Sequence, residues 1–188
     1  MKTMLKWAVA SAAVLALAAC NNTDTAETGG LEPSGRTLAQ SLGEYDQLGA
    51  VVDNAGLEQV LEGVGPYTLF APVDDAFASA RLDDTLNDEA TSAQGAALVR
   101  EHLVPGVVTR ADILAATEAS EDGSVEMRTL GEGTLTFRQQ DGVIRVQDGD
   151  REARLTGEED LASNGVVQPI DALLLAPDPG DDEAAPEG

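Results

Sequence analysis

Residues 65–77, GPYTLFAPVDDAF, carry the clearest structural signal in this chain of 188 residues. Segment 67–71 is β-prone, and it stops at Pro72, which has no amide hydrogen to continue a central β-ladder. Asp74 is a residue type that caps helix N-termini, so a helical turn carrying Phe77 is predicted to start there. The stretch therefore predicts a short strand that leads directly into a helix.

The sequence before this stretch is predicted to be helical. Leu48, Val51, Val52 and Ala55 recur at the i, i+3, i+4 and i+7 spacing of one apolar helix face. Gly56 follows at a position that suits the C-terminal cap of this helix.

Two more helices are predicted after the opening stretch. Residues 91–103 place Ala97, Leu98 and His102 on one helix face. Residues 109–112, TRAD, match a capping box in which Asp replaces the usual Glu, so another helix is predicted to begin there.

The second half of the chain changes to a strand pattern. Short β-prone runs are predicted at residues 125–130, 134–139, 143–147, 152–155 and 166–175. Turns separate them at Asp141-Gly142, Asp148-Gly149 and Asn164-Gly165, and Asp-Gly between such runs is a strong hairpin signal. Pro169 predicts an edge, a bulge or a break in the last run. Helices followed by strands favour the α+β class.

Three of these stretches, taken in order, resemble a fasciclin domain. They are residues 65–77, residues 102–106 (HLVPG) and residues 163–177 (SNGVVQPIDALLLAP). The resemblance spans about residues 37–177. The residues that match the family's motifs are Phe70, Ala71, Pro72, Asp74, Phe77, His102, Pro105, Gly106, Asn164, Gly165, Ile170 and Asp171.

The resemblance implies a wedge of two β-sheets with helices packed along one edge. It also implies a role in adhesion, or in contacts with protein or polysaccharide, without a shared catalytic site. The chain departs from the family pattern at Glu101, where many members have Tyr, and at Gln168-Pro169, where His and an apolar residue are usual. An adhesion role tied to the Tyr-His pair is therefore not carried over to this chain.

The N-terminus resembles the signal of a bacterial lipoprotein. Residues 1–19 combine a positive start with an apolar run that is too short to span a bilayer comfortably. The run ends LAAC, which resembles a lipobox, so we expect cleavage before Cys20 and attachment of lipid, such as palmitate, to Cys20. Asn21 favours the outer membrane in a host with two membranes.

Four regions follow from these patterns. We predict a lipoprotein signal peptide at 1–19, a flexible tether with the lipidated cysteine at 20–36, a fasciclin-like domain at 37–177, and an acidic disordered tail at 178–188.

Composition excludes several classes of function. The 34 acidic and 11 basic side chains give a net charge of −23, which disfavours nucleic acid as a partner. A single Cys excludes an intrachain disulfide, and a single His excludes a multi-His metal site. We therefore expect no metal and no cofactor. His102 is predicted to be a hydrogen-bonded core histidine rather than a general base, because no recognisable triad spacing accompanies it.

Four acidic residues imitate a calcium loop. Asp148, Asp150, Glu152 and Glu159 occupy its positions 1, 3, 5 and 12, but Ala153 stands where the loop requires Gly. We interpret this segment as a charged hairpin turn.

These patterns favour a lipid-anchored, non-enzymatic binding or adhesion module of the bacterial envelope. Its expected partners are the membrane, through the anchor, and an envelope or extracellular protein or polysaccharide. Two alternatives stay open: a structural or stress-linked lipoprotein without a specific ligand, and a hydrolase built on Asp and Glu side chains. Convergent carboxylates of raised pKa would favour the hydrolase, and a large exposed apolar patch would favour the binding module.

Overall fold

A computed structural model describes residues 34–82, 85–86 and 89–174. Several predicted regions therefore lie outside the described residues: the signal peptide, Cys20, most of the tether and the tail. The helices are α1 (Leu38–Ser41), η1 (Leu42–Glu44), α2 (Asp46–Asn54), α3 (Glu58–Glu62), α4 (Asp74–Ala80), η2 (Glu89–Thr91), α5 (Ser92–Glu101) and α6 (Arg110–Ala119). In the described ranges, none of the helices has the length and apolarity that a membrane crossing requires.

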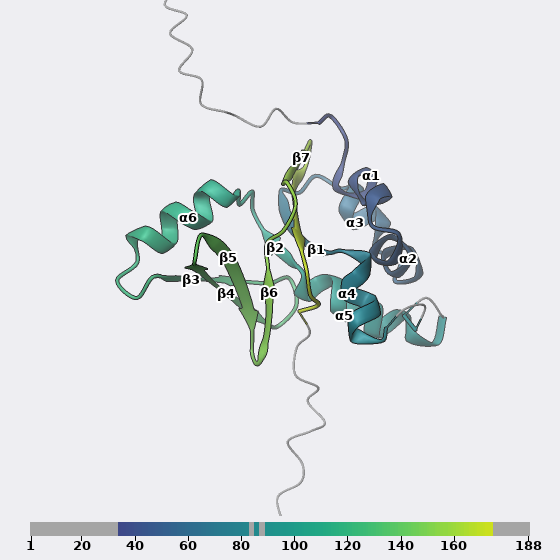
Figure 1. Ribbon diagram of the computed structural model, residues 1–188. Coiled ribbons are helices and arrows are strands. Elements are labelled where there is room, and N and C mark those ends of the chain that lie inside the picture. The colour runs from purple at the N-terminus through teal and green to yellow at the C-terminus, as the bar shows by residue number, and fades with distance from the viewer. Residues whose placement is uncertain (1–33, 83–84, 87–88, 175–188) are drawn as a thin grey trace, which may run out of the picture. The chain divides into compact units, whose positions relative to one another are not determined.

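Within the described ranges, eight strands form two four-stranded sheets (Figure 1). The first sheet has the order β2-β1-β8-β7, and its central strands β1 and β8 run parallel. The second sheet is the antiparallel meander β3-β4-β5-β6. The strands are β1 (Tyr67–Pro72), β2 (Leu103–Pro105), β3 (Ser124–Arg128), β4 (Thr134–Gln140), β5 (Val143–Asp148), β6 (Arg151–Arg154), β7 (Asp160–Ala162) and β8 (Gly165–Ile170).

Strand β1 separates two hydrophobic cores, because its side chains alternate between the two faces of the sheet. Leu69 and Ala71 belong to the core shared with the helices α1 to α5. Phe70 faces the second sheet, where its ring centroid lies 5.0 Å from that of Phe137. Helices α1 to α5, the first sheet and the second sheet therefore form successive layers, and α6 packs against the second sheet (Figure 1). The expected α+β fold is confirmed.

Several local predictions are confirmed. Thr109 and Asp112 form both hydrogen bonds of the capping box at the start of α6. The β4–β5 hairpin turns at Asp141 and Gly142, which both have positive φ, as a type I′ turn requires.

Other local predictions are wrong. Asp74 is not an N-cap: it is the first residue of α4, and its carboxylate accepts the Gln47 amide at 3.0 Å instead. Ala97 is exposed, and the buried face of α5 runs through Gly95, Ala96, Leu98 and Val99. The helix ends at Glu101, so Leu103 already belongs to β2.

The second hairpin turn lies one residue later than predicted. Asp148 pairs with Arg151, so Gly149 and Asp150 form the turn between β5 and β6. The difference matters, because a slip of one residue changes which side chains stand opposite each other across the sheet.

The break predicted at Pro169 occurs on one side of β8 only: the β7–β8 ladder ends before Pro169, whereas the β1–β8 pairing continues through Pro169 to Ile170. The Ile170 carbonyl accepts the Val73 amide on the β1 side, so Pro169 faces the opposite side of β8. The pairing of β7 with β8 ends at Val167, so the missing amide of Pro169 leaves no gap in that ladder.

Candidate functional site

His102 is part of the core. The side chain is fully buried, and its Nε2 accepts the Leu174 amide at 3.0 Å. An amide can only donate, so the ring proton lies on Nδ1, which is 2.8 Å from the Leu98 carbonyl oxygen and donates to it. Burial lowers the pKa of His102 to about 4, against the opposing effects of the Leu98 carbonyl and Glu101. The ring therefore connects the C-terminal end of helix α5 to Leu174, in the segment that follows β8.

Asn164 joins three elements through its side chain. Its Oδ1 accepts the Leu38 amide at 2.8 Å, and its Nδ2 donates to the carbonyls of Leu61 at 2.8 Å and Gly63 at 2.7 Å. The backbone carbonyl of Asn164 also accepts the Tyr67 amide. These contacts hold α1, α3 and β1 together, which is a structural role.

The two motif glycines stand at tight backbone positions. A Cβ atom at Gly165 would lie 2.0 Å from the Tyr67 carbonyl oxygen, so no larger residue fits there without moving β1. Gly106 has a φ of +100°, and its carbonyl accepts the Thr68 hydroxyl at 2.8 Å. Pro105, just before it, is exposed.

The remaining motif residues also support the scaffold. Asp171 accepts both the backbone amide and the Nε of Arg154 at 2.7 Å. Asp74 holds the start of α2 to α4, as described above. The buried members are Phe70, Ala71, Pro72, Phe77 and Ile170.

Glu101, where the chain departs from the family pattern, has a structural function that the sequence did not indicate. It is 7% exposed, and its carboxylate accepts three hydrogen bonds: the Thr129 hydroxyl at 2.8 Å, the Glu132 amide at 2.9 Å and the Gly133 amide at 3.0 Å. A Cβ atom at Gly131 would lie 2.1 Å from Oε1 of Glu101, so this loop needs its glycines to approach the carboxylate.

The four residues that imitate a calcium loop do not converge. Asp148 is buried toward Glu101, Asp150 is exposed in the turn, and Glu152 lies on the opposite side of the sheet. Glu159 accepts the Arg110 amide at 2.9 Å. In the described part of the chain, no three His, Cys, Asp or Glu side chains are grouped to hold a metal ion.

The candidate site lies on the outer face of the β3-β4-β5-β6 sheet. Leu135, Phe137, Ile144 and Val146 are buried in the core, so the alternate positions of these strands point outward. These outward positions carry four arginines and two glutamates, in contrast to the acidic chain as a whole: Arg128, Arg138, Arg145, Arg154, Glu126 and Glu152.

Three of the arginines stand side by side. Arg138 on β4 pairs in register with Arg145 on β5, and Arg145 pairs with Arg154 on β6. We call Arg138, Arg145 and Arg154 the arginine row. Like charges directly opposite each other destabilise a sheet, so the fold does not gain stability from this arrangement by itself.

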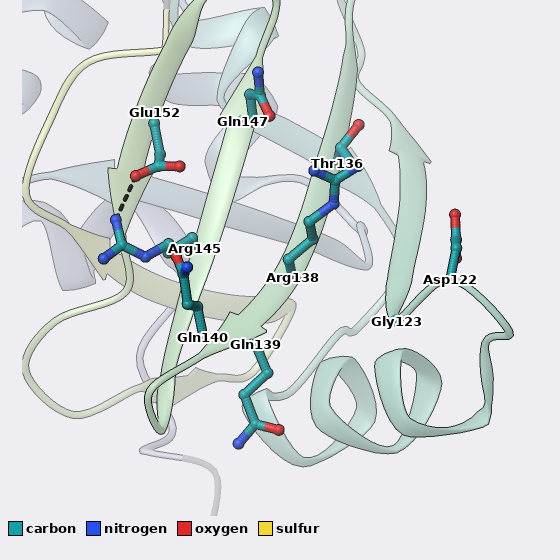
Figure 2. Close-up of a pocket in the computed structure, with 9 residues that line it drawn as sticks. All are labelled: Asp122, Gly123, Thr136, Arg138, Gln139, Gln140, Arg145, Gln147 and Glu152. Atoms are coloured by element: carbon teal, nitrogen blue, oxygen red, sulfur yellow. Dashed lines mark hydrogen bonds and ion pairs between the residues drawn. The ribbon is translucent and has the colours of Figure 1, made fainter.

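A cavity of about 330 Å³ lies over part of this row (Figure 2). Its wall has no aromatic side chain and no large apolar one, so the apolar patch expected for a binding surface is replaced here by a polar surface. The lining residues are Asp122, Gly123, Thr136, Arg138, Gln139, Gln140, Arg145, Gln147 and Glu152.

The three arginines differ in how their charges are compensated. Arg145 forms an ion pair with Glu152 across the strands, shown in Figure 2, and Arg154 pairs with Asp171 at 2.7 Å. The Nε of Arg145 is buried and has no hydrogen-bond partner within the described residues. Arg138 is exposed, and its guanidinium has neither an ion pair nor a hydrogen bond with any residue that the structure describes.

The carboxylates at this cavity are not set up as proton donors. Hydrogen bonds from Ser120 and Ser124 lower the pKa of Asp122 to about 2, so this group is ionised at neutral pH. Glu152 is engaged with Arg145. The carboxyl whose pKa is raised, chiefly by burial and then by Glu101, is Asp148, which does not line this cavity. The arrangement can bind an anionic or hydroxyl-rich group.

This site is not among the residues predicted from the sequence, although the sequence contains a signal for it. In a two-residue hairpin, the residues at equal distance from the turn stand opposite each other. Arg138 and Arg145 are symmetric about Asp141-Gly142, and Arg145 and Arg154 are symmetric about Gly149-Asp150. The register of the second turn was required to see the row.

The chain as a whole is similar to proteins of a known family. The family model described as Fasciclin domain matches residues 43–176. The chain is similar to Protein sll1483 of Synechocystis sp., with 32% identity over 71% of this chain and 68% of that protein. It is also similar to Stabilin-1 of Homo sapiens, with 28% identity over 76% of this chain and 5% of that protein.

A solved structure shares the fold. It is a FAS1 domain pair from the insect cell adhesion molecule Fasciclin I, with a TM-score of 0.65 and 18% sequence identity. The alignment covers 76% of this chain and 51% of that one, so this chain spans about half the length of the domain pair.

Proposed function

The chain belongs to the Fasciclin domain family, and on that premise we propose that it is a lipid-anchored, non-enzymatic adhesion module of a bacterial envelope. Fasciclin domains are associated with cell adhesion modules. In this proposal Cys20 carries the lipid and residues 20–36 form the tether. The domain contacts an envelope or extracellular partner through the outer face of the β3-β4-β5-β6 sheet.

The observation that carries this proposal is the polar cavity over the arginine row. A chain of net charge −23 keeps three arginines in register on one face, although opposed like charges cost stability. Arg145 and Arg154 are compensated by Glu152 and Asp171, whereas the guanidinium of Arg138 at the cavity has no partner among the described residues. Binding of an anionic group would explain why this side chain is kept there.

The hydrolase alternative finds less support. A carboxylate-based hydrolase needs one carboxyl group with a raised pKa to act as a general acid. The pKa of Asp122 in the cavity is lowered to about 2, which is the wrong direction for a proton donor. Asp148 has a raised pKa but lies 5% exposed in a different part of the sheet.

The proposal is tested by attachment of cells that carry the chain. Cells lacking the chain should attach less well to their natural surface, and wild-type chain should restore attachment. The Cys20→Ala variant should be released from the envelope and fail to restore it. Arg138→Glu should fail at normal surface levels, whereas the matched charge reversal Arg100→Glu, at an exposed position of helix α5, should succeed.

Two outcomes would overturn the proposal. Normal attachment of cells without the chain would favour the structural or stress-linked lipoprotein. Release of a sugar or peptide product by the purified chain would favour the hydrolase.

A further inference from the structure

We propose that the arginine row binds the carboxylates of an acidic polysaccharide, so that the ligand of this adhesion module is a uronate-bearing glycan. The inference rests on the proposed function and names the class of ligand for the same face. The guanidinium of Arg138 is the primary anion contact in this proposal, and Arg145 and Arg154 extend the contact across the strands.

The free hydrogen-bonding capacity of the row indicates an anion. A guanidinium carries five N–H donors arranged to bind a carboxylate through two parallel hydrogen bonds. In the described structure Arg138 uses none of its donors, and the buried Nε of Arg145 has no partner. A ligand carboxylate can therefore use the guanidinium donors of Arg138 without breaking a contact that the structure shows.

The other side chains of the cavity favour a sugar over a peptide. Gln140 and Gln147 offer both donors and acceptors, and Thr136 adds a hydroxyl, which suits a ligand rich in hydroxyl groups. A protein partner would usually require an apolar or aromatic core in the interface, and this cavity has none. The ligand is therefore expected to bind by hydrogen bonds and charge, without stacking on an aromatic ring.

The charge of the whole molecule makes this face distinctive. An acidic glycan is repelled by most of the surface of a chain with 34 acidic groups. On the outer face, four arginines offset the nearby carboxylates, so the repulsion is weakest there. Binding should therefore be specific in position and weaken as salt screens the charges.

The test is a titration of the purified protein with an oligogalacturonate, followed by calorimetry at low salt. The matched probe is the methyl ester of the same oligomer, which keeps the sugar and removes the charge. Arg138→Gln should weaken binding about tenfold, the loss expected for one charge-assisted contact. Arg100→Gln removes the same charge from an exposed position of helix α5, away from this face, and it should change affinity by less than about twofold.

Neither substitution removes a contact that the structure shows, so both variants should fold with the melting temperature of the wild type. Equal binding of the methyl ester, or equal losses in the two variants, would overturn the proposal. Stronger binding of a poly-glutamate peptide with the same charge would also overturn it, because the partner would then be an acidic protein.

The inference and the proposed function can fail separately. If cells attach through the chain but oligogalacturonate neither binds nor inhibits attachment, the glycan is wrong and the adhesion function stands. If cells without the chain attach normally, the adhesion function itself is wrong.

Discussion

The single histidine allows the buried core to be tested by its protonation. The pKa of the fully buried His102 is lowered from 6.5 to about 4, mainly by burial. In the unfolded chain the ring takes up a proton near pH 6.5, whereas in the folded chain it stays neutral. The free energy of unfolding should therefore be undiminished above pH 6.5 and fall as the pH drops toward 4, by about 2 kcal/mol between pH 7.5 and pH 5 from this group.

Proton NMR gives the direct assay. His102 is the only histidine in the chain. In a protein prepared without a histidine tag, the signal of the proton on its Cε1 therefore needs no assignment by mutation. The resonance should keep its neutral position down to about pH 5. Urea unfolding of the wild type and of His102→Gln at several pH values isolates the contribution of His102 to the free energy of unfolding. The carboxylates titrate in both proteins, so their effect cancels in the difference. A ring that titrates near pH 6.5, with parallel stability profiles for the two proteins, would refute the buried, neutral histidine.

Three further predictions concern the scaffold. Glu101→Gln should lower the free energy of unfolding by about 1.5–3 kcal/mol in urea titrations, because three donors converge on its carboxylate; an unchanged midpoint would contradict this role. Because the pKa of Asp148 is raised in the folded state, the wild type loses stability as the pH rises through that pKa. Asp148→Asn should therefore be more stable than the wild type at pH 7 and lose that advantage in acid. A lower melting temperature of Asp148→Asn at pH 7 would contradict this prediction. Gly165→Ala should cost at least about 2 kcal/mol through its clash with β1, whereas Gly43→Ala, where an added Cβ meets open space, should leave the melting temperature unchanged; equal effects would disprove the clash.

Features set by neighbouring residues could be predicted from the sequence. The capping box at Thr109 and Asp112 and the Asp141-Gly142 turn each depend on a few adjacent side chains, and both are present as expected. The order of helices and strands followed from apolar periodicity in the same way.

Features set by distant partners could not be predicted. Strands β2 and β7 have three residues each, and they exist because β1 and β8 offer them a ladder. Asp74 was expected to cap its own helix, but the Gln47 amide of another helix takes its carboxylate. In the sequence, Glu101 is only a departure from a motif. Its role depends on the loop with Glu132 and Gly133, which lies far away in the sequence.

The candidate site combines both cases. The motif residues could be found from the sequence, but in the structure they serve packing and hydrogen bonding in the scaffold. The arginine row depends on the register of two hairpins, and an error of one residue at Gly149 was enough to hide it.

If the outer face of the β3-β4-β5-β6 sheet is the contact surface, amide hydrogen exchange should reveal it. The exchange is measured for the protein alone and for the protein bound to envelope or matrix material of its host. We expect added protection in β4 and β5 around Arg138 and Arg145, and unchanged exchange in helices α2 and α5. Protection confined to the helical side, with β4 and β5 unaffected, would contradict it.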